Sequence, residues 1–242
     1  MVGMRLPARY AAAAVIGIYN LIQNRALPAG WYVPGNLVVS AGLVGLARRD
    51  GCSWQDLGLG AGRNGLAWSG AGMAGSAIVV AALSRIPATR RLFLDNRARG
   101  HDRRRRWYRA AVRFPVGTAL FEEVAFRGVV YGMWRQGGAS TLRASLASSA
   151  LFGLWHIIPT HQTLVGAGSS AGPARRAGLV AAGVVASAVS GLGFVWVRTG
   201  SGNLAAPWAT HAAFNSLSYL AATAAWDAED LHLRFAQADE AG

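Results

Sequence analysis

Apolar, charge-poor segments alternate with short polar stretches along the whole chain. They cover about residues 10–28, 31–47, 66–84, 111–134, 144–159, 178–197 and 203–226. Each is close to the roughly 20 apolar residues that a helix needs to cross the hydrocarbon core of a bilayer. The pattern predicts an all-α fold, a polytopic membrane helix bundle of about seven transmembrane helices, within a range of roughly six to eight.

Composition agrees with a membrane protein. Hydrophobic residues make up 52% of the 242 residues and charged residues 14%, whereas a soluble globular domain has roughly 25% charged residues. The apolar segments are rich in small residues, as in "SGAGMAGSA" and "AAGVVASAVSGLG". Small residues let helix backbones approach closely in lipid, so we expect them to serve packing.

The basic residues are concentrated in one segment. The chain contains no lysine and has a net charge of +13, and ten of its arginines lie from Arg85 to Arg109. A basic patch can bind nucleic acid, but beside hydrophobic spans it more simply marks a cytoplasmic loop that faces anionic lipid headgroups. We therefore expect the lipid bilayer as a partner and no nucleic acid. Strict alternation of the spans then places Arg48, Arg49 and Arg63 outside, unless a helix before residue 110 does not cross fully.

We assign no catalytic or binding role to three further features of the N-terminal half. The first span follows Arg5 and Arg9 like a signal peptide, but "ALPAG" is a poor cleavage site and the span holds three amides, Asn20, Gln23 and Asn24, so we expect a retained helix. The single cysteine, Cys52, excludes an internal disulfide. The segment "GAGRNG", residues 60–65, matches GxGxxG, but no strand pattern precedes it, which favours a glycine cluster in a membrane loop over a dinucleotide site.

The chain divides into three segments by composition. Residues 1–109 are predicted to form N-terminal membrane helices and the basic cytoplasmic loop, and residues 110–226 a helical core that holds the polar residues described below. Residues 227–242 form an acidic C-terminal tail that we expect to be solvated and frayed. Its acidic residues are Asp227, Glu229, Asp230, Asp239 and Glu240.

Two adjacent carboxylates stand inside the apolar stretch "FEEVAFRGVVYGMW". Glu122 and Glu123 are the only acidic residues from Arg103 through Trp226. In a helix, Glu123 and Arg127 lie on one face and can neutralise each other. Glu122 lies about 100° away round the helix, so it needs a partner on another helix or must hold a proton. A purely structural ion pair with a protonated neighbour stays an alternative at this point.

Candidate partners lie on two later spans. In "FGLWH", Phe152 and His156 are one turn apart, and in "HAAFN" His211 and Asn215 have the same spacing. A lone membrane histidine is more often a packing residue, but two of them together with isolated glutamates favour one polar site inside the bundle. The other three histidines lie in polar or loop stretches and are expected at the surface: His101, His161 and His232.

The segments "EEVAFR", "FGLWH" and "HAAFN" resemble, in this order, the EExxxR, FxxxH and HxxxN motifs of one protein family. This family is the CAAX prenyl protease and bacteriocin-processing family, also called CPBP or Abi intramembrane proteases. The resemblance extends through "VWVRTGSGNLAAPWATHAAFNSL" and covers about residues 110–220. It implies an intramembrane endopeptidase in a cell membrane, with a membrane-associated protein or peptide as substrate.

Matched position by position, the resemblance implies a role for each residue. Glu122 is the general base that acts on water, assisted by His156, while His211 and Asn215 polarise the scissile carbonyl and hold its oxyanion. Glu123, Arg127 and Phe152 support this set. Amide hydrolysis needs a proton acceptor for water and donors where negative charge develops, and a dry cavity strengthens both.

A metal is the open point about cofactors. Glu122, His156 and His211 also make up the ligand set of a hydrolytic zinc site that leaves one position for water. The chain has no HExxH sequence. The expectation is therefore either no cofactor or a divalent metal such as zinc, with the metal-free mechanism favoured.

Two other functions fit buried glutamate, histidine and arginine. A proton-coupled transporter also places such residues in the membrane, but it predicts two related halves, and we find no internal repeat. A non-catalytic bacteriocin-immunity or scaffold protein could keep the same cluster for packing, and only activity separates it from a protease. The arginine-rich, lysine-free composition is typical of a GC-rich bacterial genome, which disfavours prenylated substrates.

The basic segment also predicts which side the site serves. It places the start of the 111–134 span at the cytoplasmic surface, and Glu122 follows Arg109 by thirteen residues, roughly 20 Å of helix. We therefore expect Glu122, His156, His211 and Asn215 to meet in one cavity that is accessible from the cytoplasm.

Overall fold

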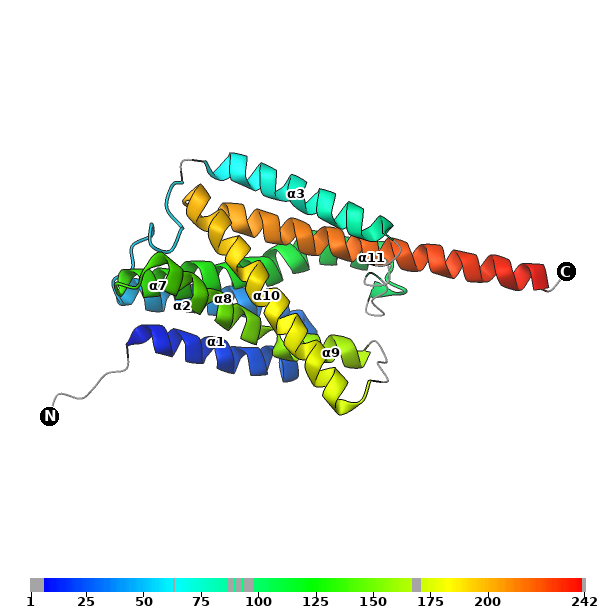
Figure 1. Ribbon diagram of the computed structural model, residues 1–242, viewed down its shortest axis with the longest axis horizontal. Coiled ribbons are helices and arrows are strands. Elements are labelled where there is room, and N and C mark those ends of the chain that lie inside the picture. Colours follow the sequence, from blue (N-terminus) through cyan, green and yellow to red (C-terminus); the bar gives the residue numbers. More distant parts are fainter. Residues whose placement is uncertain are drawn as a thin grey trace.

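The chain folds into helices joined by short connections (Figure 1). The computed structural model describes residues 7–62, 64–86, 89, 93, 98–166 and 171–240, with side chains to residue 232. Arg5, Arg63 and most of the arginine-rich segment between residues 87 and 97 lie outside this part. The helices outside the central one are α1 Ala8–Arg25, α2 Tyr32–Arg49, α3 Gly65–Arg85, α8 Thr141–Trp155, α9 Ile157–Gly166, α10 Pro173–Ser201 and α11 Ala205–Glu240, with a short 3-10 turn, η1, at Ala29–Trp31.

The all-α prediction is confirmed for the described residues, and each predicted apolar segment corresponds to a helix. Within the part of the chain that the structure describes, three helices are long and apolar enough to cross a membrane: Ala29–Arg49, Gly65–Arg85 and Pro173–Ser201, with mean hydropathies of 1.2, 1.6 and 2.0. Several candidate spans in one chain support a multi-pass membrane location. That the other helices also cross stays a prediction.

One continuous helical stretch from Arg103 to Gln136 runs through the centre of the fold. It consists of α5 Arg103–Tyr108, the π-helical η4 Arg109–Ala119, α6 Leu120–Glu122, the π-helical η5 Glu123–Val130 and α7 Tyr131–Gln136. Asp102 caps its start by accepting a hydrogen bond from the Arg105 backbone N–H at 2.7 Å. The end of the arginine-rich segment is therefore helical and continuous with the central span, where the sequence suggested a loop.

The first π-helical run of this stretch, η4, contains Pro115. Proline has no backbone N–H and its ring clashes with the carbonyl four residues earlier, so a wider turn relieves a conflict that an α-helix would have. π-helical turns are rare and are frequently found at functional sites. Here the two runs flank the three α-helical residues that end at Glu122.

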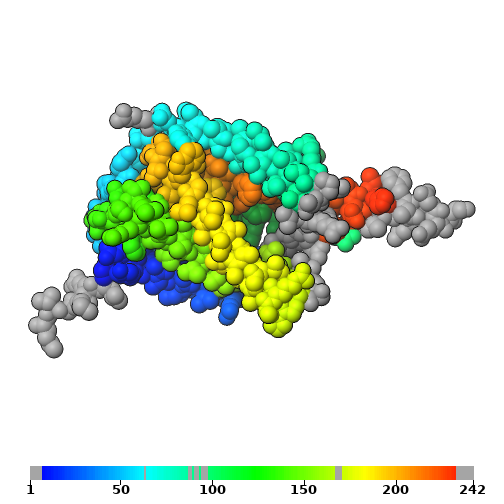
Figure 2. Space-filling model, in the orientation of Figure 1, coloured from blue at the N-terminus to red at the C-terminus, as the bar shows by residue number. Residues whose placement is uncertain are grey.

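Small residues let the surrounding helices pack closely, as predicted. α11 lies along α3, and α10 crosses α8 on the outside of the bundle (Figures 1 and 2). A Cβ on Gly153 of α8 would lie 2.7 Å from the Val184 carbonyl oxygen of α10. A Cβ on Gly191 would lie 3.1 Å from the Ser149 side chain. Side chains larger than hydrogen at these positions would separate α8 from α10.

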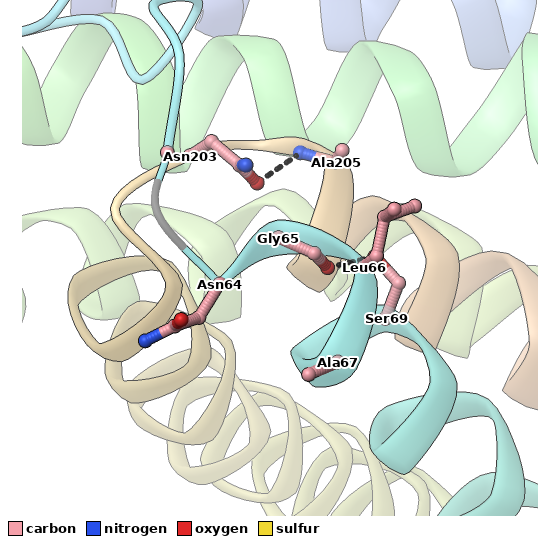
Figure 3. A pocket seen from close by; sticks show the side chains of 8 residues that line it. Asn64, Gly65, Leu66, Ala67, Ser69, Asn203 and Ala205 are labelled. Carbon is pink, nitrogen blue, oxygen red and sulfur yellow. Dashed lines mark hydrogen bonds between the residues drawn. The ribbon is translucent and has the colours of Figure 1, made fainter.

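The described residues of the GxGxxG segment that precede Gly65 are non-helical, in agreement with the expected loop. A hollow of about 440 Å³ lies at the start of α3 and α11. Figure 3 shows residues that line it, among them Asn64, Gly65, Leu66 and Asn203. A Cβ on Gly65 would lie 2.2 Å from the Asn203 amide nitrogen, so glycine permits this contact. The Asn203 side-chain oxygen accepts from the Ala205 backbone N–H at 3.1 Å and so caps α11.

The acidic end of the chain is more ordered than expected. α11 continues as a helix to Glu240 and extends beyond the rest of the bundle (Figure 1). Asp227 forms an ion pair with Arg106 at 2.5 Å, and Asp230 forms one with Arg99 at 2.6 Å. The prediction of a frayed end was therefore wrong at these residues, because the basic segment supplies cations for them.

Candidate active site

Glu122 and Glu123 are buried in the centre of the 103–136 helix. Glu123 is fully buried and Glu122 is 5% exposed. All of the residues from Phe121 to Met133 are buried, since α1, α2, α8 and α10 pack against this part of the helix. Carboxylates in such an environment need hydrogen-bond partners, because removing a charge from water without compensation costs several kcal/mol or more.

Two side chains, those of Arg127 and His211, bind the Glu123 carboxylate. Arg127 Nη1 donates to Glu123 Oε1 at 3.2 Å, and this is the i to i+4 pair that the sequence predicts. His211 Nδ1, from α11, lies 2.8 Å from the same oxygen. The Arg127 guanidinium carbon lies 4.0 Å from the centroid of the Phe152 ring, so the aromatic ring covers the cation on one side.

His211 connects the two carboxylates. A carboxylate accepts but does not donate, so His211 Nδ1 donates its N–H to Glu123, and this fixes the tautomer and the ring orientation. The ring also stacks on Phe194 with centroids 4.7 Å apart and an angle of 19° between the planes. In this orientation Nε2 lies 3.6 Å from Glu122 Oε2. The second nitrogen of the imidazole is therefore directed to the neighbouring glutamate.

The two oxygens of Glu122 have different surroundings. Trp155 Nε1 donates to Oε1 at 3.1 Å, which holds the carboxylate in one orientation. The backbone carbonyl of Trp155 in turn accepts from the Asn20 amide at 2.7 Å, so α1 supports this contact. Glu122 Oε2 has no hydrogen-bond partner among the described residues. One oxygen is thus fixed, and the other is available to accept a proton.

His156 and Asn215 lie beside Glu122 on one cavity. The cavity has a volume of about 850 Å³, and its lining includes Glu122, Trp155, His156 and Asn215. His156 Nδ1 donates to the Phe152 carbonyl at 2.8 Å, which leaves Nε2 for another partner. Within the described part of the chain, neither His156 nor Asn215 bonds directly to Glu122. The structure places Glu122, His156 and Asn215 on this cavity, and it places His211, which is not among the lining residues, against Glu122. The catalytic roles of all four residues stay predictions.

The same cavity continues along the central helix to the arginine-rich segment. There its lining includes His101, Arg105, Arg109 and Arg113. His101 was expected at the surface but is buried, and its Nδ1 lies 2.8 Å from the Tyr219 hydroxyl on α11. Burial, together with the nearby positive charge of Arg109, lowers the pKa of His101. His161 and His232 are exposed, as predicted.

The residues present do not fit a metal ion as they are placed. Among the described residues, no group of three or more His, Cys, Asp or Glu side chains could hold one. His211 uses Nδ1 for Glu123, and His156 uses Nδ1 for a backbone carbonyl. These Nδ1 bonds are compatible with metal binding through Nε2, but within the described residues Glu122, His156 and His211 do not form a group that could hold an ion, and we derive no step through a metal.

Sequence reasoning missed two aromatic residues of the site. Trp155 binds Glu122, and Phe194 stacks on His211 and lies 5.0 Å from the Arg127 guanidinium carbon. Trp155 directly precedes His156, and an indole N–H inside a membrane span needs an acceptor, which was a usable signal. Phe194 carries no such signal, because it lies in an ordinary apolar run.

The fold and the site define a helical membrane protein with a buried glutamate–histidine–arginine centre on one cavity. Residues 105–217 match the family described as type II CAAX prenyl endopeptidase Rce1-like. This match confirms the resemblance in the three motifs over residues 105–217. The matched stretch contains all seven predicted site residues. No match is found among curated proteins, and none among solved structures.

Proposed function

We propose that the protein is an intramembrane endopeptidase that hydrolyses a peptide bond of a membrane-associated protein or peptide. The observation that carries this proposal is the position of Glu122, which lines the cavity with one oxygen held by Trp155 and the other without a partner among the described residues. A buried carboxylate with one available oxygen is suited to take a proton from water.

The reaction starts when Glu122 accepts a proton from a water molecule, assisted by His156. The hydroxide attacks the scissile carbonyl carbon, and the Asn215 amide N–H donates to the carbonyl oxygen as negative charge develops there. The Nδ1–H of His211 is bound to Glu123, so His211 donates to the carbonyl oxygen through Nε2 in a form with a proton on both ring nitrogens. Glu122 then returns its proton to the leaving nitrogen, and the C–N bond breaks. No serine or cysteine nucleophile takes part.

The second carboxylate has a positioning role in this proposal. Glu123 orients His211 through Nδ1, and Arg127 balances the charge of Glu123. Phe152 covers Arg127 and also supplies the carbonyl that binds His156. These contacts explain why one buried cluster contains two carboxylates, since one reacts and the other holds a histidine in place.

The proposal also states how the helices lie in the membrane and from which side the cavity opens. About seven helices cross a bacterial cell membrane, and residues 110–226 form the catalytic core between the N-terminal helices and the acidic tail. The arginines on the cavity support a cytoplasmic entrance, because basic residues remain on that side of a membrane. Water and substrate then reach Glu122 along the cavity from the cytoplasm.

Proteomics of cleaved membrane peptides tests the proposal. Cells that carry the wild-type protein are compared with cells that carry Glu122→Ala, and with cells that carry Glu229→Ala as a control outside the cavity. At equal levels of the three proteins, we expect cleaved peptides that appear with the wild type and with Glu229→Ala and are missing with Glu122→Ala. Identical peptide patterns in all three strains would refute proteolysis and favour a non-catalytic immunity or scaffold role.

A further inference from the structure

Two backbone carbonyls beside the cavity lack the donor that a continuous helix would supply. In a helix, the carbonyl of one residue accepts from the N–H four residues later, and proline has no N–H. Pro159 follows Trp155 at this spacing, and Pro28 follows Asn24. Trp155 ends α8, and Asn24 lies in the last turn of α1. Both carbonyls therefore need a donor from elsewhere in the protein.

Amide side chains supply both donors across the contact between α1 and the pair α8 and α9. Asn20 Nδ2 of α1 donates to the Trp155 carbonyl at 2.7 Å, and Gln162 Nε2 of α9 donates to the Asn24 carbonyl at 3.0 Å. Only His156 separates the end of α8 from the start of α9. The first helix therefore binds the chain on both sides of this break.

The Asn20 amide is buried, and its orientation is fixed by the residue one turn later. Asn24 Nδ2 donates to the Asn20 side-chain oxygen at 3.0 Å and to the Asn20 carbonyl at 2.9 Å. Because the side-chain oxygen accepts this bond, the NH₂ group of Asn20 is directed to Trp155. An amide is costly to bury without partners, so an apolar side chain would fill this position more simply. The bond to Trp155 accounts for an asparagine here.

The chain segment that Asn20 holds carries two contacts of the candidate active site. Trp155 Nε1 donates to Glu122 Oε1 at 3.1 Å. The next residue, His156, lines the same cavity and donates to the Phe152 carbonyl at 2.8 Å. A shift of the Trp155 backbone would turn the indole away from Glu122 and would move His156 with it. The position of the Trp155 carbonyl therefore bears on both side chains.

We infer that Asn20 is a positioning residue of the site. Through the Trp155 carbonyl it fixes the indole that orients the Glu122 carboxylate, and it fixes the place of His156. Its effect on the reaction rests on the proposed function, whereas its effect on the orientation of Glu122 does not. Asn20 lies outside residues 105–217, the stretch that matches the peptidase family. The site therefore extends to α1, which does more than cross the membrane.

Nuclear magnetic resonance of the full-length protein in detergent micelles tests this orientation without requiring cleavage. Nitrogen-isotope labelling of tryptophan gives an indole N–H signal for each of the nine tryptophans, and Trp155→Phe identifies the signal of Trp155. A short, charge-assisted bond to a carboxylate moves the indole proton signal to lower field. Glu122→Ala removes the acceptor and gives the position of the signal without the bond. We expect Asn20→Leu to move the signal most of the way to that position.

Two further variants of α1 locate the effect. Gln23→Leu removes an amide that lines the same cavity and whose side-chain oxygen has no hydrogen-bond partner among the described residues. It should leave the Trp155 signal in place. Asn24→Leu removes the bond that orients Asn20, and it should move the signal in the same direction by a smaller amount. Asn24 is less buried than Asn20, so its variant still tests the inference if Asn20→Leu fails to fold.

Cleavage is measured in the same variants as the amount of the peptides that depend on Glu122. At equal protein levels we expect Asn20→Leu to reduce this amount roughly 10- to 100-fold, the range for residues that orient a metal ligand from the outer shell. A folded Asn20→Leu protein with the wild-type Trp155 signal would overturn the inference and limit Asn20 to a role in stability. Undiminished cleavage by this variant would overturn it as well. If the wild type cleaves nothing, the peptidase proposal fails, and the indole signal alone decides whether Asn20 positions Glu122.

Discussion

Two arginine–carboxylate pairs in this protein have the same chemistry and very different surroundings. Glu123 and Arg127 are both fully buried, and their atoms lie 3.2 Å apart. Arg106, at the start of the central helix, and Asp227 of α11 lie 2.5 Å apart, with side chains 27% and 55% exposed. The shorter distance belongs to the exposed pair, yet the buried pair should matter more to folding.

The difference lies in what remains when one partner is removed. At the exposed end, water and salt replace a lost partner, so such pairs contribute roughly 0–1 kcal/mol. In the centre of the bundle no water replaces it, and an isolated charge stays in a low-dielectric environment. The buried pair is also connected to His211, whereas the exposed pair connects two helix segments away from the buried glutamates.

Arg127→Ala should give the largest effect. It leaves Glu123 without its cation, and breaking a buried pair costs roughly 3–5 kcal/mol. We expect a strong loss of folded protein, measured as yield of monodisperse protein in detergent and as melting temperature. Arg143→Ala, at an exposed arginine of α8, is the control and should leave both values unchanged. Normal yield and melting temperature for Arg127→Ala would contradict the pairing.

Replacing both partners separates stability from activity. In Glu123→Leu/Arg127→Leu no isolated charge remains, so we expect the melting temperature to recover most of what Arg127→Ala loses. Activity should stay low, because His211 Nδ1 loses its acceptor. Removal of an orienting carboxylate from a Ser-His-Asp triad lowers kcat by about 10⁴-fold, and we expect a loss of up to about that size in peptide cleavage. A stable double variant with normal cleavage would refute the positioning role of Glu123.

Asp227→Asn should have a small effect. The Arg106 partner lowers the pKa of Asp227, so this pair stabilises the fold above the unfolded-state pKa, and its contribution is lost as the pH falls through the folded-state value. At neutral pH we expect a loss below about 1 kcal/mol, which is at most about 4 °C in melting temperature. High salt should reduce the difference between wild type and variant. A loss in melting temperature as large as that of Arg127→Ala would show that the exposed pair stabilises the fold as much as the buried pair does.

His101 provides the smallest and most local test. Its pKa is lowered by burial and by the nearby arginines, so the unfolded chain binds a proton at a higher pH than the folded chain. Its stabilising contribution is therefore present above the unfolded-state pKa and is lost as the pH falls through the lower folded-state value. We expect the melting temperature of His101→Gln to fall less than that of the wild type as the pH is lowered from about 6.5. An unchanged pH profile would place His101 in water, contrary to its burial.

The buried pair was predictable from the sequence and the exposed end of the cavity was not. Glu123 and Arg127 are four residues apart, so helix geometry alone brings them together. His101 and Tyr219 are separated by 118 positions, and Arg106 and Asp227 by 121. Nothing local marks such pairs, since they depend on how α11 lies along the central helix. The helices themselves were predictable from apolar runs, whereas the π-helical runs and the helical state of residues 103–109 depend on packing and on Pro115.

The π-helical runs on both sides of Glu122 also bear on how this protein can change during evolution. Arg113 and Glu122 share one helix and line one cavity, so their relative direction depends on the number of residues between them. Insertion or deletion of one residue between them turns one group relative to the other by roughly a quarter of a turn and shifts it along the axis. Related chains can therefore exchange side chains at many positions of this segment, but a change in its length would turn Arg113 and Glu122 away from the cavity that they share. We expect the spacing between these two residues to persist where the surrounding sequence does not.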